Sequence, residues 1–534
     1  MSLLPALLLL AAGTAATAAE AQQAAPSAGA ELVVERSIDD LSADLAAGRT
    51  SSEALVRAYL ARIEAIDRKG PTLRSVIATN PDAIAQARML DAERRAGRLR
   101  GPLHGIPVLV KDNIDTIGMA TTAGSLALKD NMTNRDAPLV AKLRAAGAII
   151  LGKTNLSEWA NIRSTRSMSG WSAVGGLVRN PYALDRTACG SSSGSGAAAA
   201  ASLAAATVGT ETDGSIVCPS SINGLVGMKP TLGLVSRTHV VPISHSQDTA
   251  GPMTRSVRDA ALMLTAMAGS DPADAATAQA DAKRVDYAKG LDANGLRGVR
   301  VGVVRPPNLS PDLARVFDTA LEQLKTAGAV LVPVERPATP GMGAAEFSVL
   351  LTELKADLDA YLATTPKAVT ARTLDAVIAF NAANAASEMP FFEQEIFLDA
   401  AKTKGLDDPA YRTARETSLR LAGKDGIDAM LAKANVALLV APTAGAAWPS
   451  DPVHGDQSDG PSASSMPAIA GYPHLTVPMG LVDGLPVGLS FFSTAWRDAE
   501  VLKAGYAFEQ RAKARVAPRY LPSVDAGPGL DGVR

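Results

Sequence analysis

Serine hydroxyls are concentrated in one stretch, residues 186–224, which reads RTACGSSSGSGAAAAASLAAATVGTETDGSIVCPSSING. Glycine, serine and alanine dominate the stretch, and it contains no histidine. A serine hydroxyl is a weak nucleophile until a neighbouring base takes its proton. The composition therefore indicates covalent catalysis only if the base comes from another part of the chain.

Two other interpretations of the stretch account for less of it. A flexible linker would be polar throughout, whereas residues 197–206 are mostly alanine and favour a helix. A nucleophile elbow, G-x-S-x-G, matches residues 190–194, but that motif requires a buried strand before the serine and a histidine downstream. The preceding YALDRTACG does not resemble a buried strand.

A lysine is the alternative base. Lys111 follows the apolar residues 108–110, at the end of a short predicted strand. Burial disfavours a charged amine, so a desolvated lysine can be neutral near pH 7 and accept a serine proton. A lone lysine in such a place is more commonly ion-paired or extends its amine to the surface. Likewise, Ser215 in GTETDGSIVCPS could be only a turn residue in a glycine loop.

Composition excludes several other classes of function. Lys and Arg total 52 against 54 Asp and Glu, and no basic tract offers a surface for nucleic acid. The histidines show no H-x-H or H-E-x-x-H spacing, so we expect no metal and no cofactor. The five histidines are His104, His239, His245, His454 and His474.

The first residues resemble a secretory signal peptide. An apolar segment at residues 3–12 precedes Ala19-Glu20-Ala21, an A-x-A cleavage pattern, although no Lys or Arg comes before it. The apolar segment is shorter than the ~20 residues of a spanning helix. We therefore expect a signal peptide at residues 1–21, a disordered linker at 22–30, export to the periplasm or medium, and no integral membrane span in the mature protein.

Only two cysteines are present, Cys189 and Cys218, on either side of the serine-rich stretch. In an exported protein they could form a disulfide, and two buried free thiols are an equal alternative.

The elements that must position these residues alternate between helices and short apolar strands. Helix is predicted from Ser51 or Ser52 onward, with Leu55, Tyr59 and Ile63 on one face, and in residues 344–422. Buried strands are predicted at residues 108–110, 148–151, 296–304 and 435–443, and a hairpin turns at Asp483-Gly484. This alternation predicts an α/β fold, a mixed central sheet sandwiched between helices, in one domain at residues 31–525 with a flexible tail at 526–534.

Several blocks, taken together, resemble the amidase signature family. GIPVLVKDN, GKTNLSEWA, CGSSSGSGAA and GTETDGSIVCPSSINGLVGMKPT follow one another in the order and spacing of that family, and Ser191 and Ser215 are 24 residues apart, as its two serines are. Within the family, RGPLHGIPVLVKDNI, CGSSSGSG and AFNAANAASEMPFF are similar to bacterial peptide amidases.

The resemblance implies a Ser–cis-Ser–Lys triad: Ser215 as nucleophile, Ser191 as the bridging serine after a cis peptide bond, and Lys111 as base. The oxyanion would be bound by the backbone N–H groups of Thr212, Asp213, Gly214 and Ser215. Asp213 and Val217 replace the glycine and arginine common in the wider family, in agreement with peptide amidases. Asp213 and Ser192 are therefore candidate substrate-binding residues, although Asp213 could simply stabilise the loop.

The implied reaction is hydrolysis of the C-terminal carboxamide of peptides, or of amino-acid amides, to the acid and ammonia, by a monomer. Broad aliphatic or aryl amidase activity is the alternative within the family. An inactive periplasmic binding protein on the same scaffold is the alternative of another class, and it predicts the loss of a triad position that this chain retains.

Overall fold

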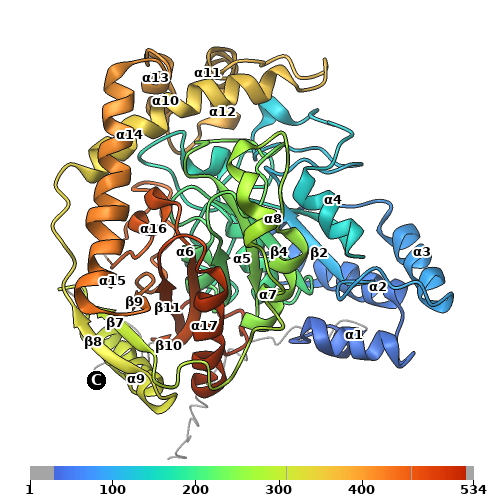
Figure 1. The fold of residues 1–534 in the computed structure, drawn as a ribbon. Helices are drawn as coiled ribbons and strands as arrows, with labels where there is room; N and C mark the ends of the chain where they lie inside the picture. The colour runs from blue at the N-terminus through green and yellow to red at the C-terminus, as the bar shows by residue number, and fades with distance from the viewer. Residues whose placement is uncertain (1–28, 308, 459, 525–534) are drawn as a thin grey trace, which may run out of the picture.

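The computed structural model describes residues 29–307, 309–458 and 460–524, and Figure 1 shows its ribbon. The predicted signal peptide, most of the linker and the predicted tail at 526–534 lie outside these residues. Within the described ranges, no helix combines the length and the apolar character needed to cross a membrane.

One 11-stranded mixed sheet organises the described chain, in the order β1-β3-β2-β4-β6-β5-β10-β11-β9-β7-β8. Parallel pairs join β3, β2 and β4, and again β9, β7 and β8, whereas the pairs between β4 and β9 in this order are antiparallel. The strands are β1 (Val76–Thr79), β2 (Pro107–Lys111), β3 (Ile149–Thr154), β4 (Ala206–Glu211), β5 (Val226–Lys229), β6 (Thr249–Thr254), β7 (Arg300–Val304), β8 (Val330–Val334), β9 (Leu438–Pro442), β10 (His474–Val482) and β11 (Leu485–Phe492).

Helices flank this sheet and form the remaining layers (Figure 1). The α-helices are α1 (Ile38–Ala46), α2 (Ser52–Arg62), α3 (Ala83–Arg95), α4 (Pro138–Ala145), α5 (Ser193–Ala200), α6 (Val217–Ile222), α7 (Val257–Met267), α8 (Ala280–Lys283), α9 (Pro311–Thr326), α10 (Met342–Ala363), α11 (Leu374–Ala383), α12 (Ala385–Glu388), α13 (Glu395–Ala401), α14 (Pro409–Ala422), α15 (Ala429–Ala434), α16 (Ser465–Ala470) and α17 (Asp498–Ala512). Short 3₁₀ or π turns are η1 (Ala30–Leu32), η2 (Ile63–Arg68), η3 (Leu126–Leu128), η4 (Glu158–Asn161), η5 (Ala275–Gln279) and η6 (Gly423–Asp428).

Local signals in the sequence explain several of these boundaries. Ser51 caps α2, its side chain accepting a hydrogen bond from the N–H of Ala54, and Leu55 and Tyr59 of that helix are fully buried. The β10–β11 hairpin turns at Asp483 and Gly484, both with positive φ, as predicted. The α/β fold with a mixed sheet is thus confirmed.

The region predicted as one helical stretch is divided into separate helices. Helices α10 and α14 are long, and they pack against each other with α11, α12 and α13 nearby, at the top of Figure 1. An apolar cluster beneath α10, α11 and α13 includes Leu354, Leu358 and Phe397, and it extends to Trp159 and Val241. Helix α10 therefore packs on residues that precede it by 100 positions or more.

Candidate active site

Lys111 is the last residue of β2, in the middle of the parallel part of the sheet. The neighbouring strand β4 runs parallel to β2, with Val110 opposite Val208, so Lys111 and Thr210 come together at the carboxyl ends of the two strands. Open parallel sheets place their ligand sites at this edge. The strand that the sequence predicts therefore places Lys111 at the sheet edge where such ligand sites occur.

The lysine amine is fully buried among hydroxyl groups. Lys111 Nζ donates to Ser191 Oγ at 2.7 Å, to Ser192 Oγ at 3.1 Å and to Thr210 Oγ1 at 2.8 Å. None of these partners carries a charge. Burial lowers the pKa of Lys111 to about 7, although the negative charges of Asp248 and Glu211 act in the opposite direction.

Ser191 and Ser192 lie directly before α5, where the Gly190–Ser191 peptide bond is cis. Ser192 is fully buried; its Oγ donates to Thr210 O at 3.0 Å and accepts from Thr210 N at 3.2 Å. The predicted substrate contact of Ser192 gains no support from this arrangement. Its hydroxyl instead fixes Thr210 and the amine of Lys111.

Ser215 lies in the loop between β4 and α6 and is half-buried. Its carbonyl oxygen accepts from the N–H of Ser192 at 3.2 Å, which places the loop against the Ser191–Ser192 segment. Among the three residues predicted to react, Lys111 is hydrogen bonded directly to Ser191. Ser215 is linked to them only through the backbone hydrogen bond between its carbonyl oxygen and the N–H of Ser192.

The loop that carries Ser215 presents backbone donors. In the described ranges, four consecutive N–H groups, those of Thr212, Asp213, Gly214 and Ser215, donate no hydrogen bond. The next two N–H groups, of Ile216 and Val217, both donate to Glu211 Oε2, at 2.8 and 3.0 Å. Glu211 therefore fixes the end of the loop and leaves the donors before it available for an anion.

Two further contacts, from Asp248 and Gln247, hold the loop that carries Ser215. Thr212 Oγ1 donates to Asp248 Oδ1 at 2.6 Å, and Gln247 Nε2 donates to Thr212 O at 3.3 Å. Asp248 also accepts from the N–H groups of Ile243 and Ser244. Residues 243–248, which we call the bracing loop, thus connect the donor loop to the rest of the molecule.

Asp213 occupies the position next to the predicted oxyanion site. Burial raises the pKa of its carboxyl, while hydrogen bonds from Ser464 and Ser465 and the positive charge of Lys229 oppose that rise. Ser464 also lies close to the donor loop, since a Cβ on Gly214 would meet Ser464 Oγ at 3.1 Å. The carboxyl of Asp213 is thus part of the donor loop itself, and its contact with substrate stays a prediction.

The two cysteines form a disulfide between Cys189 and Cys218. The bridge connects the residue before Gly190 to the first turn of α6, one on each side of the candidate site. The sequence left the pairing open, because Cα positions, here 6.1 Å apart, cannot be read from spacing.

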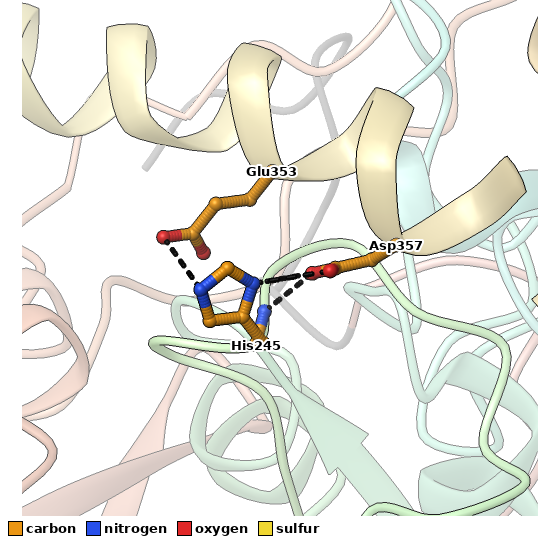
Figure 2. A group of neighbouring side chains, drawn as sticks. All are labelled: His245, Glu353 and Asp357. Atoms are coloured by element: carbon orange, nitrogen blue, oxygen red, sulfur yellow. Dashed lines mark hydrogen bonds and ion pairs between the residues drawn. The ribbon is translucent and has the colours of Figure 1, made fainter. Parts of the chain in front are cut away.

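One cluster of possible metal ligands is present in the described chain, formed by His245, Glu353 and Asp357 (Figure 2). Both ring nitrogens of His245 already face a carboxyl group, since Nδ1 lies 2.9 Å from Asp357 Oδ2 and Nε2 lies 3.5 Å from Glu353 Oε1. Hydrogen bonding to Asp357 raises the pKa of His245. Because the carboxylates lie against opposite ring nitrogens, this arrangement holds the imidazole between two carboxyl groups and fastens the bracing loop to α10.

Sequence reasoning missed several of these groups. Glu211 stands in the quoted GTETDGS block, and its place four residues before Ser215 could have indicated a loop-capping role. Thr210 stands in the same block, but neither its type nor its spacing indicated a contact with Lys111, and Asp248 has no such signal. Neither has Glu346 on α10, which accepts from Gln247 Nε2 at 2.9 Å.

Comparison with known proteins agrees with this geometry. The Amidase family model matches residues 54–502. A probable amidase of Arabidopsis thaliana is 38% identical over 501 residues, which cover 92% of this chain and 92% of that protein. The crystal structure of native peptide amidase from Stenotrophomonas maltophilia is 53% identical, with a TM-score of 0.87, and covers 91% of this chain and 98% of that chain. Peptide amidase in complex with the competitive inhibitor chymostatin is also 53% identical, with a TM-score of 0.89, over 91% of this chain and 99% of that chain.

Proposed function

Since this chain belongs to the amidase signature family and is a hydrolase of non-peptide carbon–nitrogen bonds, we propose that it hydrolyses the C-terminal carboxamide of peptides. The observation that carries the proposal is the environment of Lys111: a fully buried amine, bonded to Ser191 Oγ at 2.7 Å, with hydroxyl partners and a pKa of about 7. The similarity to peptide amidase supports the choice of substrate.

In the proposed reaction, Ser215 Oγ attacks the carboxamide carbon as its proton passes to Ser191 Oγ. Ser191 passes its own proton to neutral Lys111, so that the charge ends on the lysine. The carbonyl oxygen becomes an oxyanion, and the free N–H groups of residues 212–215 stabilise it. Collapse of this intermediate breaks the C–N bond, and Lys111 returns a proton through Ser191 to the departing ammonia.

Water completes the cycle by the same route. The relay takes a proton from water, which attacks the Ser215 ester, and returns a proton to Ser215 Oγ when the ester breaks. The products are the peptide acid and the regenerated serine. Ser192 and Thr210 contribute by holding the lysine amine toward Ser191.

Mass spectrometry of matched peptides tests the substrate. We expect an amidated peptide to exchange NH₂ for OH with its chain uncut, and the free-acid peptide to remain unchanged. Cleavage within the chain would contradict the proposal. Equal or faster hydrolysis of simple aliphatic or aryl amides would favour the broad amidase instead, and binding without turnover would favour an inactive binding protein.

Covalent labelling tests the nucleophile. A phosphonate or acyl probe should modify Ser215 in the native protein and should not react with Ser215→Ala. Ser220→Ala is a matched control, because Ser220 lies on nearby α6, is fully buried and has a hydroxyl that reaches no partner among the described residues. Labelling that persists in Ser215→Ala would show that another residue is the nucleophile.

We also propose that the protein is exported, as the predicted signal peptide implies. The Cys189–Cys218 disulfide supports this, because disulfides persist in oxidising compartments. Residues 1–30 fused to a reporter that folds only after export should give activity, and the secreted or periplasmic chain should begin at Gln22. A mature chain that retains residues 1–21 would contradict the cleavage site.

Light scattering of the mature protein tests the predicted monomer.

A further inference from the structure

The bridging serine lies at the end of a long irregular segment. Residues 162–192, all of which the structure describes, form no helix and no strand between η4 and α5. Ser191 is the last residue but one of this segment. Irregular backbone has no regular ladder of hydrogen bonds of its own, so the position of Ser191 depends on contacts with other elements.

The position of Ser191 matters because its hydroxyl would carry the proton between two other elements. Lys111 Nζ, at the end of β2, lies 2.7 Å from Ser191 Oγ. Ser215 lies two residues before α6. Proton transfer needs heavy atoms about 2.6–3.2 Å apart. A displacement of Ser191 by ~1 Å relative to either partner can therefore lower the rate by about 100-fold.

The Cys189–Cys218 disulfide connects this segment to α6 close to both serines. Cys189 lies two residues before Ser191. Cys218, in the first turn of α6, lies three residues after Ser215. Cys218 N also donates to Gly214 O at 2.8 Å, within the loop of backbone donors. The bridge therefore holds the backbone on both sides of the proposed proton relay.

The other contacts between these two elements are hydrogen bonds. Ser192 N donates to Ser215 O at 3.2 Å, and Asn223 Nδ2, just after α6, donates to Ala188 O at 3.0 Å. Helix α6 itself packs against β5, β10 and β11. The disulfide thus fastens the end of an irregular segment to a helix that the sheet already holds.

We propose that the Cys189–Cys218 disulfide is a redox switch on the amidase site: the bridged form is active, and reduction stops turnover while the fold remains. This inference rests on the proposed function. On reduction the Sγ–Sγ bond breaks, and each cysteine gains one electron and one proton from a dithiol, which closes to its own disulfide. The released end of the segment then shifts relative to α6, and Ser191 leaves the geometry for proton transfer.

The switch would link activity to export. Thiols stay reduced in the cytoplasm, and disulfides form and persist in oxidising compartments. The chain would therefore be inactive where it is synthesised. It would become active after export, when an oxidant of the disulfide class takes two electrons and two protons from the two thiols.

Reduction of the purified protein by dithiothreitol tests the switch. The chain has only two cysteines, so the reagent has no other disulfide to reduce. We expect kcat for an amidated peptide to fall by about 100-fold with little change in KM, because the bridge positions reacting groups. Circular dichroism at the assay temperature should stay unchanged, and oxidised glutathione should restore kcat.

The double variant Cys189→Ala, Cys218→Ala is the matched control, and it lacks the bridge even if the reagent reaches the disulfide slowly. It should have the low kcat of the reduced protein, and dithiothreitol should not change that value. A folded protein that keeps the wild-type kcat, with both thiols shown free by alkylation and mass spectrometry, would overturn the inference. Unfolding of the reduced protein at the assay temperature would also overturn it, since the bridge would then stabilise the whole fold.

Hydrogen exchange gives a readout without turnover. Reduction should speed the exchange of backbone N–H groups in residues 186–192 and 212–218 and leave β2 and β3 protected. Unchanged exchange in both segments would contradict the inference. Failure of the proposed function is distinguishable, because it would remove turnover in both redox forms and leave this difference in exchange.

Discussion

Two buried lysines on neighbouring strands differ in the groups that surround their amines. Lys111 ends β2 and Lys153 lies on β3, where it pairs with Val110, and both side chains are fully buried. The amine of Lys111 has only neutral oxygens as hydrogen-bond partners. The amine of Lys153 lies 2.9 Å from Asp112 Oδ1, with Thr121 Oγ1 and the carbonyl of Ala120 as further acceptors.

The difference shows that burial alone does not give a lysine its role. Desolvation acts on both amines, but an adjacent carboxylate favours the charged form and hydroxyls do not. Asp112 lies next to Lys111 in the sequence, yet its carboxyl faces Lys153. We therefore expect Lys111 to act as a base and Lys153 to hold β2 and β3 together.

The largest effect should follow substitution of Lys111. Lys111→Met removes the base, and kcat should fall by about 10³-fold or more, since general-base catalysis and nucleophile activation are lost together. The fold should remain, because the variant leaves no buried charge. Steady-state kinetics and thermal unfolding measure the two effects. Wild-type turnover in this variant would refute the role of base.

Substitution of Lys153 should instead reduce stability. Lys153→Met leaves Asp112 buried without its ion pair, which should lower the free energy of unfolding by about 3–5 kcal/mol. Turnover per folded molecule should fall far less than in Lys111→Met. Urea unfolding and active-site titration separate these quantities.

The double variant Lys153→Met, Asp112→Asn provides the control for that result. It removes the unpaired carboxyl, and should recover most of the lost stability. A double variant less stable than Lys153→Met would show that Asp112 stabilises the strands by other contacts.

The pH dependence should distinguish Lys111 from a third buried lysine. Only neutral Lys111 accepts a proton, so kcat/KM should rise with pH through about 7. Lys229 on β5 has its pKa lowered by burial to about 8, with Glu211, Asp498 and Asp213 opposing. Lys229→Met should keep the rise at about 7. A flat profile between about pH 5 and 8 in the wild type would exclude Lys111 as the titrating base.

The smallest effect should come from one hydroxyl near the base. Ser192→Ala removes the hydrogen bonds between its hydroxyl and the backbone of Thr210 as well as the 3.1 Å hydrogen bond from Lys111 Nζ, and it leaves those from Lys111 to Ser191 and to Thr210 Oγ1. Only the bond from Lys111 Nζ acts on the base directly. A net hydrogen bond contributes about 1 kcal/mol, so kcat should fall by roughly fivefold. A loss as large as that of Lys111→Met would mean that Ser192 belongs to the proton relay itself.

Local sequence patterns predicted the parts of the site that depend on neighbouring residues. The apolar run before Lys111, the cap at Ser51 and the Asp483-Gly484 turn each specify a local conformation, and the structure has all three. The division of residues 342–422 into several helices was not predicted, because most residues there favour helix and the breaks depend on packing between α10, α13 and α14.

The sequence by itself determined the family and the α/β class and predicted the reactive residues, because these are carried by motifs and by the period of the apolar residues. Tertiary structure alone decided which buried lysine faces hydroxyls and that Cys189 joins Cys218. The physical reason is that charge states inside a protein depend on desolvation and on neighbours a few ångströms away, and those neighbours come from distant parts of the chain.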